Sequence, residues 1–177
     1  MELKEVFARR KSVRSYTGEP ITDEQLEIIL AAAKAAPVAM AQFDSMHLTV
    51  ITNAELLASI ERAGGEMFGD PSRKMLYGAP TLVLVSAKIP DASRENSMHS
   101  SAAMVVHNMA LQATELGVGS VDIWGTIAAA SQKPELVAAM QLPEGFVPCC
   151  GIALGQTAEE LPVRDIPADK IAVSTIA

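Results

Sequence analysis

The sequence predicts a protein of the α+β class, with roughly four strands and five or more helices. Apolar runs that are rich in β-branched residues and have the length of a strand occur at residues 47–52, 81–87 and 146–155. Segments with helical periodicity and recognisable capping residues lie between these runs. No Gly-x-Gly-x-x-Gly or Gly-x-x-x-x-Gly-Lys-Ser/Thr sequence is present. The signatures of the Rossmann and P-loop nucleotide folds are therefore missing.

The length and composition favour one domain spanning residues 1–177. The chain is 49% hydrophobic, and a domain of this size buries about 70% of the surface that its unfolded chain exposes. Its 21 acidic residues outnumber its 14 basic ones, which gives a formal net charge of −7. A nucleic-acid partner normally requires a basic face, so we expect none.

The hydropathy pattern predicts a cytoplasmic protein without a membrane partner. The N-terminal sequence MELKEVFARRKS has no apolar run of signal-peptide length. No segment approaches the ~18 uninterrupted apolar residues of a spanning helix.

The clearest predicted helix covers residues 23–35. Thr22 and Gln25 have the spacing of a capping box, apolar residues recur on one face, and Pro37 lies beyond the end. Residues 47–52 then form a predicted strand. Asn53 is a suitable N-cap for a second helix, which precedes the predicted strand at 81–87.

After a polar loop, a third helix is expected from about Met98 to Leu116, where Gly117 ends it. This helix is apolar around most of its circumference, which is typical of a helix buried either in the domain or in a subunit interface. Residues 118–124 follow in an extended pattern. Pro134 occupies a suitable first position for a short helix, and residues 146–155 form the last strand.

The sequence contains no obvious catalytic constellation. Cys149 and Cys150 are adjacent within an apolar run, which excludes a disulfide framework and favours a buried strand. His47, His99 and His107 lack the spacing of metal ligands, and no Gly-x-Ser-x-Gly elbow is present. We therefore predict no catalytic side chain and no metal, and we expect a bound cofactor to supply any chemistry.

A basic cluster stands out in this acidic chain, in the sequence RRKSVRSY of residues 9–16. One interpretation is a solvated helix end, where cations are favoured by the helix dipole. The other is a phosphate clamp, because guanidinium groups and a serine hydroxyl together supply the donors that a phosphate monoester needs.

Three segments carry a resemblance to the FMN-dependent nitroreductase family, and the resemblance covers nearly the whole chain. They read VFARRKSVRSYTGEPITDEQLEIILAAAKAAP, MALQATELGVGSVDIWG and LPEGFVPCCGIALGQTAEELPVRD. The first is similar to the family's Arg-x-Ser-x-Arg/Lys segment, capped helix and Ala-Pro motif. The second resembles its central helix and Gly-Ser stretch, and the third its last strand and late arginine. The resemblance implies a mixed, mainly antiparallel sheet flanked by helices, in an intertwined homodimer.

The resemblance also implies where FMN would bind. Its phosphate and ribityl chain would contact Arg10, Lys11, Ser12 and Arg14, and Arg164 would also reach the phosphate. The segment Pro37, Val38, Ala39 and Met40 would pack on the flavin of the other subunit, and Ile123, Trp124 and Gly125 would contact the ring near N5 through their backbone. Lys11 or Arg14 would stabilise the negative charge of the reduced ring.

Two departures from the family pattern affect this site. Val38, Ala39 and Ala41 stand where hydroxyl and amide side chains are usual, so side-chain hydrogen bonds to the flavin are lost there. Trp124 stands where several relatives have a smaller or acidic residue. Its indole either stacks near the flavin pocket or fills the core.

The function that the resemblance implies is an FMN-dependent NAD(P)H oxidoreductase of the nitroreductase type. NADH or NADPH would deliver a hydride to flavin N5, and a small organic acceptor such as a nitroaromatic or a quinone would then take the electrons in a ping-pong sequence. Two alternatives remain open. One is a flavin-binding storage or sensing dimer without turnover, and the other is a dimerisation domain without a cofactor.

Overall fold

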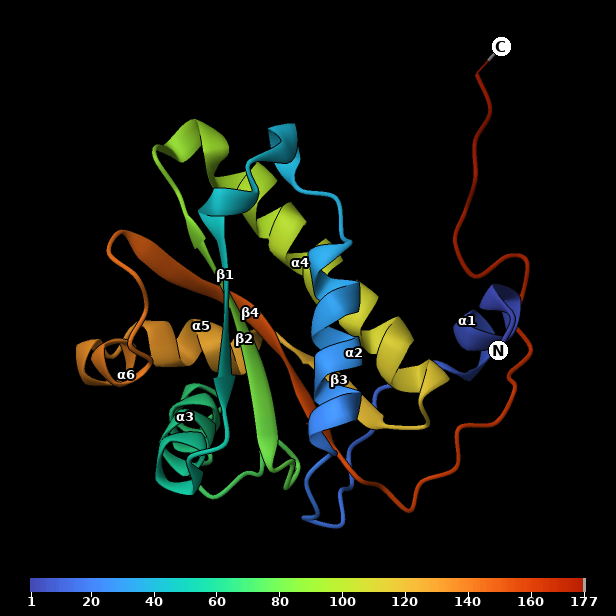
Figure 1. Ribbon diagram of the computed structural model, residues 1–177, viewed down its shortest axis with the longest axis horizontal. Coiled ribbons are helices and arrows are strands. Elements are labelled where there is room, and N and C mark those ends of the chain that lie inside the picture. Colours follow the sequence, from blue (N-terminus) through green and yellow to red (C-terminus); the bar gives the residue numbers. More distant parts are fainter. Residues whose placement is uncertain (177) are drawn as a thin grey trace.

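The protein is built around a four-stranded sheet with helices on both faces (Figure 1). The computed structural model describes residues 1–176. Its strands lie in the order β1-β2-β4-β3, and every neighbouring pair is antiparallel. The strands are β1 (Met46–Ile51), β2 (Thr81–Lys88), β3 (Gly119–Ile123) and β4 (Phe146–Gly155). The helices are α1 (Leu3–Arg9), α2 (Asp23–Lys34), α3 (Ala54–Met67), α4 (Ala92–Glu115), α5 (Gly125–Ser131) and α6 (Pro134–Ala139), with short 3-10 turns at Ala39–Ala41 and Phe43–Ser45.

The side chains of the strands alternate between two hydrophobic cores. Val83 and Ile152 belong to the core under α2 and α4. Leu82 and Leu84 belong to the core under α3, α5 and α6. All four are fully buried, and burying such a side chain contributes about 1.5–3 kcal/mol. A slip of one residue would exchange the two faces, so the alternation fixes the register.

A β-bulge interrupts the pairing of β2 with β4. Val85 pairs with Cys150 and Ser86 pairs with Pro148, so Cys149 is an extra residue on β4. Because of this extra residue, Cys149 and Cys150 both belong to the core under α4 instead of facing opposite sides of the sheet. The expected buried strand for the two cysteines is confirmed.

Most of the predicted elements are confirmed together with their ends. The Thr22 hydroxyl accepts from the Gln25 amide at 3.1 Å, and the Gln25 side chain accepts from the Thr22 N–H at 3.0 Å, which completes the capping box. Asn53 caps α3 by accepting from Leu56 N–H at 2.8 Å. Pro134 begins α6.

Helix α4 differs from its prediction at both its start and its outer side. It begins at Ala92 because Asp91 caps it, accepting from Ser93 N–H at 2.8 Å, so the expected polar loop is partly helical. The helix is also not buried all round within one chain, because Ala103, Met104 and His107 face outward. Helix α1 ends at Arg9, as the interpretation of the basic cluster as a helix end implies, whereas α5 was not predicted as a separate helix. No helix within residues 1–176 has the length and apolar character needed to cross a membrane.

Candidate functional site

The basic cluster follows helix α1 and passes beside strand β3. The N–H of Val13 donates to the carbonyl of Ser120 on β3 at 2.9 Å, and the Val13 side chain is fully buried. This anchor fixes the middle of the cluster against the sheet. Lys11 and Ser12 are half-buried on one side of the anchor, and Arg14 is exposed on the other.

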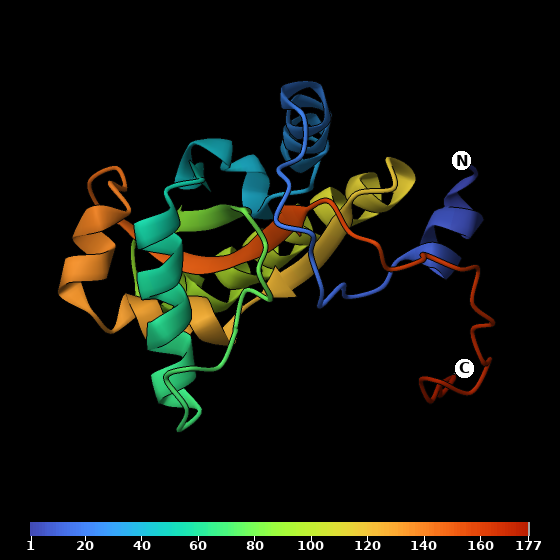
Figure 2. The same cartoon turned by 90° about the horizontal axis from the view of Figure 1, so that it is seen from below.

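The segment after β4 runs antiparallel to the basic cluster and bonds to it repeatedly. We call residues 156–164 the strap. Its N-terminal end pairs with Thr17, whose N–H donates to the carbonyl of Gln156 at 3.0 Å. Its C-terminal end returns to α1, where Arg164 N–H donates to the carbonyl of Ala8 at 3.2 Å. Figure 2 shows this end of the chain passing beside α1, away from the sheet.

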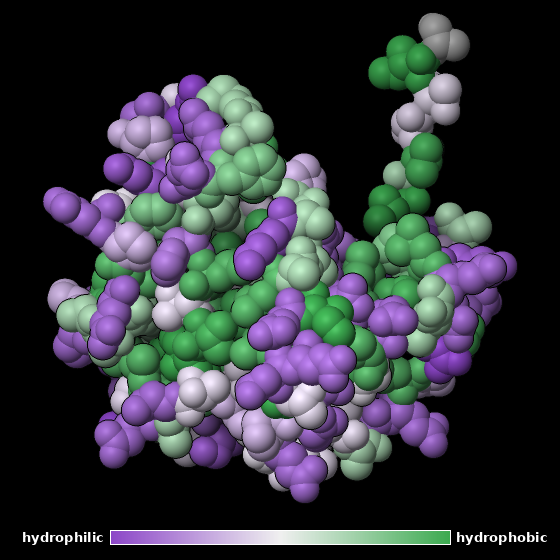
Figure 3. All heavy atoms as spheres, in the orientation of Figure 1, coloured by the Kyte–Doolittle hydropathy of each residue, from purple (hydrophilic) through white to green (hydrophobic). Residues whose placement is uncertain are grey.

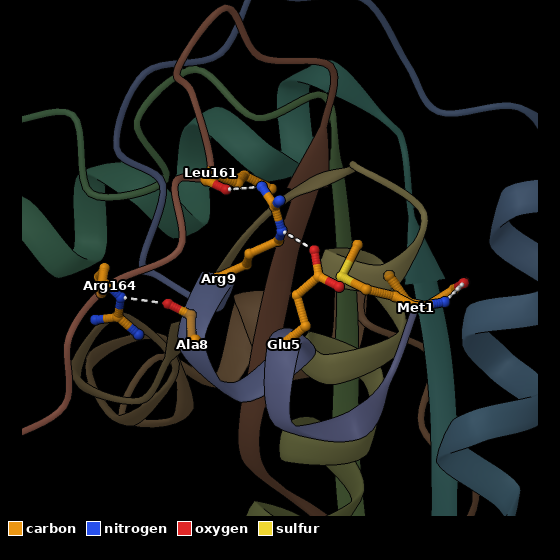
Figure 4. Close-up of polar contacts among 7 residues, drawn as sticks. Met1, Glu5, Ala8, Arg9, Leu161 and Arg164 are labelled. Carbon is orange, nitrogen blue, oxygen red and sulfur yellow. Dashed lines mark hydrogen bonds and ion pairs between the residues drawn. The ribbon is translucent and has the colours of Figure 1, made fainter.

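Two arginines at or near the cluster, Arg9 and Arg164, donate hydrogen bonds to the protein itself. Arg9 donates to Glu5 and to the Leu161 carbonyl, both at 2.8 Å (Figure 4). The Arg164 guanidinium donates to the carbonyls of Ala8 at 2.9 Å, of Phe7 at 3.4 Å and of Arg10. These are carbonyls at the end of α1, so Arg164 satisfies the helix C-terminus.

Lys11 forms an ion pair with the strap. Its ammonium lies 2.7 Å from the carboxylate of Glu159 and 3.3 Å from the carbonyl of Glu160. The other oxygen of Glu159 accepts from Arg14 N–H at 2.9 Å. These hydrogen bonds and the nearby ammonium hold the pKa of Glu159 below its usual range.

The remaining donors of the cluster are available to a ligand. Within residues 1–176, the side chains of Arg10 and Ser12 have no hydrogen-bond partner in the protein. The guanidinium of Arg14 makes only a long contact of 3.5 Å to the Ser12 carbonyl and lies 5.9 Å above the ring of Tyr77. Arginine and serine donors of this kind suit a phosphate monoester. The structure therefore divides the predicted clamp into free donors and donors that hold the strap.

The predicted platform at residues 37–40 has a strained backbone. Met40 and its neighbour Ala41 both have φ of 54°, a left-handed conformation that residues other than glycine adopt at a cost of roughly 1–2 kcal/mol each. The segment is held on α4, because Ala39 N–H donates to the buried hydroxyl of Ser101 at 3.0 Å. Strain that the surrounding structure maintains is common at functional sites.

The residues predicted to contact the flavin ring lie where β3 ends and α5 begins. Ile123 is buried, whereas the Trp124 side chain is 68% exposed. The indole therefore does not fill the core, and the expectation that it stacks near the flavin pocket stays a prediction. Gly125 is the first residue of α5.

A loop that the sequence reasoning did not single out borders the same place. A Cβ at Gly125 would lie 3.3 Å from the Phe68 ring, and the Arg73 guanidinium lies 5.7 Å above that ring. The same loop supplies Tyr77 beneath Arg14. It connects α3 to β2, and its sequence signal is two aromatic residues, Phe68 and Tyr77, with the cations Arg73 and Lys74 between them.

A hollow of about 560 Å³ lies where the platform, α4 and β3 meet. Pro37, Met104, His107 and Asp122 are among the residues that line it, so the platform, the outer face of α4 and strand β3 meet there. This volume is within the range of small-molecule sites. Asp122 is exposed on β3, but desolvation by the surrounding atoms raises its pKa, while the charges of Arg10 and His107 act in the opposite direction.

The three histidines considered from the sequence are dispersed: His107 lines the hollow, whereas His47 and His99 do not. His47 is on β1, where its ring meets Phe146 edge-on at 6.0 Å. His99 and His107 are on α4, and among residues 1–176 no three His, Cys, Asp or Glu side chains are grouped as for a metal.

Comparison with known proteins gives consistent matches along the chain. The model of the nitroreductase family matches residues 7–156. An FMN reductase [NAD(P)H] from Bacillus subtilis is 28% identical over 163 residues, which cover 84% of this chain and 63% of that protein. A nitroreductase from Bacteroides fragilis, solved with bound FMN, has a TM-score of 0.81 and 26% identity and covers 99% of this chain and 100% of its own. A nitroreductase from Desulfitobacterium hafniense, also with bound FMN, has a TM-score of 0.82 and 24% identity over the same shares.

Proposed function

Because the chain belongs to the nitroreductase family, we propose that it is an FMN-dependent NAD(P)H oxidoreductase that reduces a small organic acceptor. In this proposal residues 1–177 form one FMN-binding domain. The observation that carries it is the pair of half-buried side chains, Arg10 and Ser12, that have no partner within the described residues. They lie beside β3, which leads directly to Trp124 and Gly125.

The residues present fit a flavin mononucleotide. Arg10 and Ser12 would bind the phosphate, with the guanidinium of Arg14 nearby and the backbone of Ile123–Gly125 beside the ring. Pro37–Met40 would provide an apolar surface against the ring. Lys11 and Arg164 would support the site through the contacts that they make with the protein.

When bound, FMN supplies the redox chemistry, by accepting a hydride from NAD(P)H and passing the electrons to the acceptor. The protein then needs no nucleophile, which agrees with the absence of a nucleophile signature in the sequence. Arg14 would stabilise negative charge on the ring, because its exposed guanidinium makes a single long hydrogen bond within residues 1–176. The two substrates would use one open face in turn, so we expect parallel lines in double-reciprocal plots of the initial rates.

We also propose that the protein is a homodimer. Met104 is 39% exposed on the outer face of α4, at the rim of the hollow described above. The tail beyond the strap carries Ile171 and Val173 into solvent, and Figure 3 shows its hydrophobic residues projecting from the body. A second hollow of about 440 Å³ between α2, α4 and β1 has a largely apolar lining. A second copy would cover such surfaces.

Light scattering tests the proposed dimer, and Met104→Glu should shift the equilibrium from dimer toward monomer. Ala58→Glu is the control, because it adds the same charge to the exposed side of α3. A wild-type protein that is a stable monomer at micromolar concentration would contradict the proposed dimer.

The function is tested by the absorption spectrum and by anaerobic reduction. Purified protein should be yellow, and NADH or NADPH should bleach the colour, which an added quinone or nitroaromatic should restore. Arg10→Ala or Ser12→Ala should weaken FMN binding by about 10- to 150-fold, whereas riboflavin should bind wild type poorly. A protein that binds FMN but is never reduced would be a flavin-binding module instead.

A further inference from the structure

The strap places a carboxylate inside the basic cluster, next to the donors that the proposed function assigns to the phosphate. We infer that Glu159 is a positioning residue for this anion site, holding Lys11 and the Arg14 amide so that Arg10 and Ser12 are presented to the phosphate. This inference rests on the proposed function for the identity of the ligand.

The contacts of Glu159 lie on both sides of Ser12 and directly after Arg10. Its carboxylate accepts from the Lys11 ammonium at 2.7 Å and from Arg14 N–H at 2.9 Å. Ser12 lies between these two residues in sequence, and Arg10 directly precedes them. Two fixed points therefore define the path of the short segment that carries the donors.

Glu159 is itself held in place by its neighbours. Its N–H donates to the hydroxyl of Thr157 at 3.0 Å, and that hydroxyl donates to the carbonyl of Ser15 at 2.7 Å. The backbone of the strap is thus fixed before the carboxylate reaches across. The Glu159 side chain is 27% exposed and that of Lys11 is 30% exposed, so the pair is only partly screened by water.

The ion pair with Lys11 also limits the electrostatic cost of having the Glu159 carboxylate near the phosphate. A carboxylate near a phosphate repels it, and this repulsion alone would weaken binding. In this structure, however, the charge of Glu159 is balanced by Lys11 at ion-pair distance. The net effect of Glu159 is then to order the segment, at little electrostatic cost to the ligand.

Two variants of Glu159 distinguish a role in ordering the segment from electrostatic repulsion of the phosphate. Glu159→Ala and Glu159→Gln both remove the negative charge, but the glutamine oxygen remains able to accept from Arg14 N–H. If Glu159 positions the segment, Glu159→Ala should weaken FMN binding by about 5- to 20-fold, less than the loss of a direct hydrogen bond to the phosphate, because Glu159 acts through its neighbours. Glu159→Gln should recover part of this loss. If Glu159 only repels the phosphate, both variants should bind FMN more tightly.

Glu160→Ala is the matched control. It removes the same charge from the adjacent residue, whose contact with Lys11 is through the backbone carbonyl, and it should leave FMN binding within about twofold.

FMN affinity is measured by fluorescence titration of flavin-free protein, with riboflavin in parallel. Riboflavin affinity should hardly change in Glu159→Ala, because riboflavin has no phosphate. Equal losses for FMN and riboflavin would show a general structural role and overturn the inference.

Inorganic phosphate makes the test independent of flavin binding. Phosphate should raise the melting temperature of flavin-free wild type and of Glu160→Ala, and raise that of Glu159→Ala less. Amide exchange at Arg14 should be faster in Glu159→Ala than in wild type. A wild-type protein that binds no FMN would refute the proposed function alone. An unchanged or larger phosphate effect in Glu159→Ala would refute the positioning role.

Discussion

The buried hydroxyl of Ser101 accepts a hydrogen bond from the backbone N–H of Ala39 at 3.0 Å, and donates to the carbonyl of Ser97 at 2.8 Å. Through this side chain, helix α4 holds the residue that precedes Met40 and Ala41, both of which have left-handed backbones. Arg94 of the same helix donates to the Met40 sulfur at 2.9 Å. The strained segment is thus contacted from distant parts of the chain, 62 and 54 residues away.

Replacing Ser101 by alanine should therefore destabilise the protein and loosen the platform. The Ala39 N–H would lose its acceptor, which costs about 1–3 kcal/mol of the free energy of unfolding. Urea denaturation measures this loss, and amide exchange at Ala39 should become faster. Ser59→Ala is the control, because the Ser59 hydroxyl bonds only within α3, to the Glu55 carbonyl. Comparable losses in the two variants would contradict the special role of Ser101.

Replacing Gly65 by alanine should disturb the loop between α3 and β2. A Cβ at this position would lie 2.4 Å from the Asp70 carbonyl oxygen and 3.1 Å from the Pro71 Cα. These are backbone atoms, so the loop must move, at a cost of about 1–3 kcal/mol. Because Phe68 belongs to this loop and lies beside Gly125, FMN affinity should fall as well. Thermal unfolding and flavin titration measure the two effects, and unchanged values for both would disprove the close packing.

The two cysteines should be unreactive in the folded protein. Burial raises the pKa of Cys149 to about 11 and that of Cys150 to about 12. A free thiol has a pKa of about 8.5, so at pH 8 the thiolate fraction of either cysteine falls by at least about 100-fold. Iodoacetamide labelling followed by mass spectrometry should be slow in native protein and complete for both cysteines in urea. Rapid modification without urea would contradict their burial.

The ion pair of Lys11 with Glu159 should make stability depend on pH in the acidic range. The folded-state pKa of Glu159 is lowered, so its contribution is present above the unfolded value of about 4.3. The contribution is lost as the pH falls through the lower folded value. Wild type should therefore exceed Glu159→Gln in stability at pH 7, by up to about 1 kcal/mol for a partly exposed pair. Urea denaturation at pH 7 and below pH 4 tests this, and a constant difference would contradict it.

Local signals in the sequence were sufficient for much of the fold. The capping pair Thr22 and Gln25, the N-cap Asn53 and the initial Pro134 act within a few residues of themselves, so the pattern predicts them well. Helix α1 is only seven residues long, too short to give a clear periodic signal. The bulge at Cys149 depends on pairing with β2 and has no local signature.

The candidate site was predicted only in part, because its contacts join residues that are far apart in the sequence. The basic residues 9–14 are conspicuous in an acidic chain. Which of them is free depends on the strap, about 150 residues later, and neither the pairing of Lys11 with Glu159 nor that of Arg164 with the end of α1 has a sequence signal. The expectation that Lys11 contacts the flavin phosphate stays a prediction, now set against its ion pair in the structure.

The strap also has a consequence for the order of events during synthesis. Arg9 bonds to Leu161, and Ala8 bonds to Arg164, across separations of 152 and 156 residues. The ribosome adds about 5–20 residues per second and releases the N-terminus first, so residues 8–15 leave it long before their partners at 156–164 are made. These contacts therefore form late, and until then the basic cluster is without the strap.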